Sequence, residues 1–118
     1  MSTLKVLTVD GSGQTYADPA NRGNTVRFKS NTTSKALNGV QVQNHTQEII
    51  YNDSNAVDLN GVHAFDPVSV RLRTSGAAVS SQRIRLILLA MAAQVGTWET
   101  EGVFQGFPPV TAPVIPAV

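Results

Sequence analysis

Residues 66–95 read DPVSVRLRTSGAAVSSQRIRLILLAMAAQV, and the spacing of the apolar residues changes within this stretch. In its first part the apolar residues occupy every second position: Val68, Val70 and Leu72. This period is typical of a β-strand that turns one face to a core. We therefore predict a strand at residues 68–73, opened by Pro67.

The second part of the stretch has the spacing of a helix. Its apolar residues recur at intervals of three and four positions: Ile84, Ile87, Leu88, Met91 and Val95. Ser80 or Ser81 can cap the start of this helix, and we expect Gly96 to end it. Four more residues extend the apolar surface around the cylinder: Leu86, Leu89, Ala90 and Ala93. A helix this apolar needs two surfaces to pack against, so we predict an intertwined homodimer whose helices pack on the partner's sheet.

Upstream of this stretch the chain alternates between strand patterns and polar segments. We predict strands at residues 4–9, 14–17, 25–30 and 40–51, the last with a bulge near Asn44. Asp10-Gly11-Ser12-Gly13 predicts a hairpin turn. Three segments rich in Asn, Asp, Gly, Ser or Thr predict loops or turns: residues 18–24, 31–36 and 52–61. The fold class is thus α+β, with an N-terminal β-hairpin and an antiparallel β-meander of five or six strands before one helix.

Length and composition indicate one domain that takes part in an assembly. The 118 residues match the usual size of a domain. Its parts would be the hairpin at 1–20, the sheet at 24–75, the helix at 80–96 and a Pro-rich C-terminal segment at 97–118. Charged residues make up 14% of the chain, against roughly 25% in ordinary soluble domains. A surface so poor in charge suggests that much of it is buried against other subunits.

Several classes of protein are disfavoured by the sequence. It contains no cysteine, so neither a disulfide framework nor a thiolate metal site can form. The N-terminus lacks the apolar core of a signal peptide. The longest apolar run, residues 86–93, is far shorter than the roughly 20 residues of a membrane-spanning helix. We expect a soluble protein, intracellular when made, without a membrane partner.

The acidic residues avoid two long windows that are rich in cations. Residues 19–47 and 67–98 contain no Asp or Glu, and each window holds four Lys or Arg residues. Four of the eight cations alternate with apolar residues at strand spacing: Arg27, Lys29, Arg71 and Arg73. Strands of this kind turn a basic face away from the core, and a polyphosphate is the obvious partner.

The quoted stretch, from Asp66-Pro67-Val68 through the corner at Thr74-Ser75-Gly76 to the helix, resembles the coat proteins of single-stranded RNA bacteriophages. The resemblance is one of layout and covers nearly the whole chain. It implies that two chains form one continuous sheet, that dimers assemble into an icosahedral shell, and that the inner sheet face binds genomic RNA. In this family the bound RNA is often a hairpin that marks the genome for packaging and represses replicase translation. The protein would be made in the cytoplasm of a bacterial host and would reside in the virion.

We predict that the RNA-binding face carries Arg27, Lys29, Arg71 and Arg73 as phosphate contacts. We assign to the same face five side chains of the strand at 40–51, which could reach or stack on unpaired bases: Gln41, Gln43, His45, Gln47 and Tyr51. Arg83 and Arg85 begin the helix and are not assigned to RNA, because the helix should lie on the opposite side of the sheet. The alternative is an ordinary solvated sheet face, since polar-out alternation is common in antiparallel strands.

No pattern in the chain indicates an enzyme. His45 and His63 stand outside any metal-binding motif. Gly11-Ser12-Gly13 lacks the context of a nucleophile turn, and a strand follows it where a phosphate loop would need a helix. We therefore expect no catalytic residue, no metal and no cofactor. Two other hypotheses stay open, a cellular dimeric RNA-binding regulator that forms no shell and a structural β-module without affinity for RNA.

Overall fold

The computed structural model describes residues 3–11 and 13–117, and it divides into two compact units, Met1–Ser75 and Gly76–Val118. Ser12 of the predicted hairpin turn lies outside the described residues. Within them, no helix is long and apolar enough to cross a membrane.

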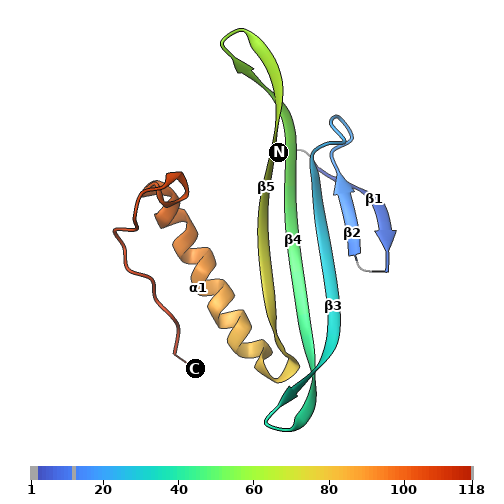
Figure 1. Cartoon of the computed structure of the whole chain (residues 1–118), viewed down its shortest axis with the longest axis vertical. Coiled ribbons are helices and arrows are strands. Elements are labelled where there is room, and N and C mark those ends of the chain that lie inside the picture. The colour runs from blue at the N-terminus through green and yellow to red at the C-terminus, as the bar shows by residue number, and fades with distance from the viewer. Residues whose placement is uncertain (1–2, 12, 118) are drawn as a thin grey trace. The chain divides into compact units, whose positions relative to one another are not determined.

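The first unit is an antiparallel meander whose strands follow one another in sequence order (Figure 1). Five strands are described: β1 (Lys5–Asp10), β2 (Gly13–Ala17), β3 (Thr25–Leu37), β4 (Val40–Leu59) and β5 (Val62–Ala77). Each strand pairs with the next, as expected for a meander with short connections. The predicted antiparallel meander of five or six strands followed by one helix is confirmed, with five strands described.

Strands β3 and β4 are much longer than predicted. Their register runs without a break from the pair Thr25–Asn52 to the pair Leu37–Val40. The predictions of a turn at 31–36 and a bulge near Asn44 are therefore wrong. The prediction of a loop at 52–61 is also wrong, because β4 continues to Leu59. The polar residues that suggested loops instead pair across the strands, as when Thr32 Oγ1 lies 3.0 Å from His45 Nδ1.

The true turns are two Asn-Gly pairs. Asn38 and Gly39 have φ angles of 49° and 80°, and Asn60 and Gly61 have 53° and 84°. Two successive residues with positive φ form the tight turn that matches the twist of a hairpin, and Asn and Gly tolerate it best. Strand β5 begins right after the second turn, so the prediction that Pro67 opens it is wrong. Pro67 is tolerated because β5 is at the edge of the sheet.

Little of the chain is buried. Among the described residues, only four apolar side chains are buried: Ala17, Val26, Ile50 and Ala77. Many large apolar side chains are exposed, including Val70 at 65%. Apolar side chains that gather on one surface in this way would mark an interaction site.

The second unit contains one long helix, α1 (Ser81–Thr100), between two short 3-10 helices, η1 (Ala78–Ser80) and η2 (Val103–Gln105). The start agrees with the prediction, with Ser80 at the N-cap position, although its side chain makes no capping hydrogen bond. The predicted end at Gly96 is wrong, since a glycine inside a helix costs only about 1 kcal/mol. The helix ends at Thr100 with Glu101 at the C-cap position, and Gly102 follows with a φ of 82°, the left-handed conformation found after helix ends.

Candidate nucleic-acid interface

Two of the predicted cations lie side by side on one face of β3. Arg27 pairs with Ile50 of β4, and Lys29 pairs with Glu48. Directly paired residues in an antiparallel sheet share a face. Arg27, Lys29, Ile50 and Glu48 therefore belong to the same face of the sheet.

The cations of β5 join the same face. The two-residue turn places Leu59 opposite Val62, and at the other end of the pair Thr46 Oγ1 lies 3.3 Å from Ser75 Oγ. Counting residue by residue from the turn also brings Thr46 opposite Ser75. The same count sets Arg73 opposite Glu48, and Arg71, two residues earlier, shares its face.

Lys29, Glu48 and Arg73 line one surface pocket of about 390 Å³, together with Ser30, Asn31 and Thr46. We call the surface formed by Arg27, Lys29, Arg71 and Arg73 the basic face. Lys29, Arg71 and Arg73 form no salt bridge within residues 3–11 and 13–117. Their charges are thus available to an anionic ligand.

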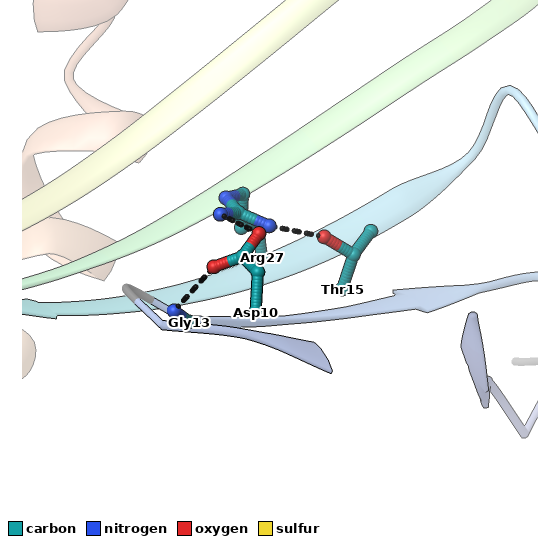
Figure 2. A network of polar contacts seen from close by, with 4 residues as sticks. All are labelled: Asp10, Gly13, Thr15 and Arg27. Carbon is teal, nitrogen blue, oxygen red and sulfur yellow. Dashed lines mark hydrogen bonds and ion pairs between the residues drawn. The ribbon is translucent and has the colours of Figure 1, made fainter. Parts of the chain in front are cut away.

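Arg27 differs from the other three cations because it joins the N-terminal hairpin to β3. Figure 2 shows its guanidinium between two side chains, with Nη2 2.9 Å from Asp10 Oδ2 and Nη1 donating to Thr15 Oγ1 at 2.7 Å. The other oxygen of Asp10 accepts a hydrogen bond of 2.9 Å from the Gly13 N–H. Arg27 thus has a structural role that the sequence did not reveal, because Asp10 looked only like a turn residue.

The windows free of acidic residues along the sequence are not free of them in space. Pairing of the strands brings Glu48 beside Lys29, and Asp10 to Arg27. These two carboxylates lie among the four cations that define the basic face, so the face keeps a net positive charge. Its electrostatic attraction for phosphate is weaker than the sequence windows alone suggest.

The side chains predicted to read bases do not lie on this face. The register pairs Thr32 with His45, Ser30 with Gln47 and Val26 with Tyr51. Residues of even number in β3 face away from Arg27 and Lys29. The assignment to the basic face is therefore wrong for these five: Gln41, Gln43, His45, Gln47 and Tyr51.

Tyr51 belongs to an apolar surface on that opposite side, which we call the apolar face. Its members come from β3, β4 and β5: Val26, Phe28, Ile49, Tyr51, Val68, Val70 and Leu72. Tyr16 of β2 extends it, with its ring 5.7 Å from the Phe28 ring in an edge-to-face arrangement. Val26, Tyr51, Val68 and Val70 line a surface pocket of about 470 Å³. One side of the sheet thus carries the basic face, with Ile50 as an apolar residue among the cations. The other side carries the apolar face near Phe28 and Tyr51, and polar residues such as Gln47 and His45 follow farther along the strands.

Among the described residues, no group of three or more His, Cys, Asp or Glu side chains lies close enough together to hold an ion.

Comparison of the structure with solved structures finds proteins of virus-like particles. The chain is similar to that of the virus-like particle of bacteriophage PQ-465, with a TM-score of 0.85, 22% identity, and coverage of 98% of this chain and 97% of that one. For the virus-like particle of bacteriophage ESE001 the TM-score is 0.64 at 13% identity, with 98% and 100% coverage. For that of Beihai levi-like virus 32 it is 0.60 at 13% identity, with 93% and 90% coverage.

The sequence itself matches no family model and no curated protein. The structural similarity nevertheless extends over nearly the full length of each chain. The resemblance to phage coat proteins is therefore confirmed at the level of the fold.

Proposed function

We propose that this chain is the coat protein of a single-stranded RNA bacteriophage, a structural protein and not an enzyme. Dimers of the chain assemble into an icosahedral shell, which encloses the genome in the virion. The observation that carries the proposal is the full-length similarity to the chain of a virus-like particle, with a TM-score of 0.85. Fold alone does not define function, so the two faces of the sheet supply the physical argument.

The apolar face supports the homodimer. Phe28 is 45% exposed and Tyr51 is 58% exposed in the single chain. Helix α1 exposes apolar side chains of its own, among them Ile87, Leu89 and Met91. Burial of apolar surface stabilises association by roughly 25 cal/mol per Å² before the costs of binding. If the helix of one copy covered the apolar face of another, the apolar surfaces of both the helix and the sheet would be buried.

The basic face supports the RNA partner. Lys29, Arg71 and Arg73 are free of salt bridges within the described part of the chain, and Arg27 contributes charge while it holds the hairpin. Contacts of this kind bind phosphates without reading sequence. Repression of replicase translation through an RNA hairpin would use the same face. The amide and aromatic side chains of β4 are left out, because they lie on the opposite face.

Electron microscopy of the purified recombinant protein tests the proposal. Uniform hollow particles a few hundred ångström across support a coat protein. Small dimers at every salt and protein concentration tried would instead favour a cellular regulator that binds RNA. Particles or dimers whose absorbance shows protein alone would favour a structural module without RNA.

The double variant Arg71→Ala with Arg73→Ala tests the basic face. We expect particles with severalfold less RNA and a folded dimer, because two phosphate contacts are lost. In binding assays with a single-stranded RNA, the negative slope of log K against log salt should become shallower by roughly 1.4, because two phosphate contacts are lost. Arg83→Ala with Arg85→Ala removes the same charge from α1 and should leave RNA content unchanged. If RNA content stays the same in the first variant while the dimer dissociates, the face has been assigned wrongly.

A further inference from the structure

One carboxylate gathers the chain that follows α1. Glu101 occupies the C-cap position of the helix, and both oxygens of its carboxylate accept hydrogen bonds from residues nine and ten positions later. The Val110 N–H donates to Oε1 at 2.8 Å, and the Thr111 N–H lies 3.1 Å and 3.2 Å from the two oxygens. The Thr111 hydroxyl donates to Oε2 at 2.5 Å. A carboxylate with three donors from two adjacent residues fixes the position of that segment.

Two further contacts close the same loop. The indole N–H of Trp98 donates to the Thr111 carbonyl oxygen at 3.1 Å. The Phe107 N–H donates to the Gly102 carbonyl oxygen at 3.1 Å, and a Cβ at Gly102 would lie 2.9 Å from Phe107 Cδ2. Residues 101–111 thus form a compact loop that closes back on Trp98 in the last turn of α1. Beyond it, apolar side chains such as Ile115 stay exposed.

The loop depends on the ionised form of Glu101. Its three donors are neutral, and they favour the carboxylate over the protonated acid, which has lost an acceptor site. The pKa of Glu101 is lowered from its ordinary value of 4.5, first by the Thr111 hydroxyl and then by the Thr111 N–H; partial desolvation opposes the shift, and the Val110 N–H adds to it.

No other titratable side chain faces this carboxylate from the elements of the loop. Residues 102–117 contain no Asp, Glu, His, Lys or Arg. On α1, Glu99 stands two positions away, whereas Arg83 and Arg85 lie at the far end of the helix, about 24 Å or more along its axis. The protonation of Glu101 itself therefore controls the contacts.

We propose that Glu101 is a pH-sensitive latch that holds the C-terminal segment at the end of α1. The latch is closed while the carboxylate is ionised, and protonation opens it. Because the pKa is lowered in the closed state, the stabilisation is complete above pH 4.5 and is lost as the pH falls through the lowered value. The inference concerns one chain only, so it does not depend on the proposed coat function.

Trp98 is the only tryptophan of the chain, so the fluorescence of the full-length protein reports on the latch. We expect one change in emission with a midpoint below pH 4.5, with the helical signal in circular dichroism retained. Glu101→Gln, which replaces one acceptor oxygen by a donor as protonation does, should show the open emission at pH 7 and no midpoint. Thr111→Val should raise the midpoint toward the ordinary value, because it removes the largest cause of the shift.

Glu99→Gln is the matched control, since it removes the same charge two residues away and should keep the wild-type titration. Hydrogen exchange at pH 7 provides a second measurement that acid unfolding cannot affect. The Val110 and Thr111 amides should exchange at least several-fold faster in Glu101→Gln than in Glu99→Gln. Equal exchange in the two variants, or a wild-type midpoint that persists in Glu101→Gln, would overturn the latch.

Discussion

Each end of this chain is held by one carboxylate, Asp10 near the N-terminus and Glu101 after α1. The partners of these two carboxylates differ. Asp10 bonds to the charged guanidinium of Arg27 and so joins the N-terminal hairpin to β3. Within residues 3–11 and 13–117, the donors to Glu101 are the neutral groups of Val110 and Thr111. The first contact is an ion pair half open to water, which salt screens. The contact of Glu101 responds to pH, because a protonated carboxyl offers one acceptor site fewer to the donors of Val110 and Thr111.

The N-terminal fastening also depends on a close approach of two strands. A Cβ at Gly13 would lie 2.1 Å from the carbonyl oxygen of Phe28, a backbone atom that cannot rotate away. Gly13→Ala should push β2 from β3 and break the contacts of Asp10. We expect a loss of about 3 kcal/mol in unfolding free energy, by analogy with overpacked sites, measured by chemical denaturation.

Gly11→Ala in the same turn is the control for this substitution. A Cβ at Gly11 meets nothing within 4 Å, so that variant should stay within about 0.5 kcal/mol of the wild type. Equal destabilisation by the two alanines would show that the strands do not approach as closely as described.

The ion pair itself should have a smaller effect. A double-mutant cycle of Asp10→Asn and Arg27→Met measures its coupling, and we expect roughly 0.2–1 kcal/mol, since the side chains are 50% and 25% exposed. Raising the salt concentration to about 1 M should reduce the coupling further. A coupling that does not change with salt would mean that the hydrogen-bond geometry, and not charge, dominates this contact.

The smallest effect concerns the C-terminal loop in the same salt series. We expect the amide exchange rates of Val110 and Thr111 at pH 7 to change little, because no cation faces Glu101 within residues 98–117. A strong salt dependence of exchange at these two amides would show that the Glu101 contact is as sensitive to salt as the Asp10–Arg27 ion pair.

Much of the fold was readable from local sequence. The alternation at residues 25–30 and 68–73 predicted strands, and the pattern after the corner predicted a helix capped by Ser80 or Ser81, of which Ser80 holds the N-cap position. The lengths of the elements were less predictable. Asn, Ser and Thr favour loops in isolation, yet in β3 and β4 the Asn-Gly turns and the cross-strand ladder hold them extended.

The chain by itself determined which residues of each strand share a face, because that period of two is local to the backbone. Only the tertiary pairing decided which face of one strand joins which face of the next. The turn at Asn38 and Gly39 sets Arg27 opposite Ile50 and sends Gln47 to the other side. A shift of one residue in that register would exchange the two faces of β4, and nothing within a single strand specifies it.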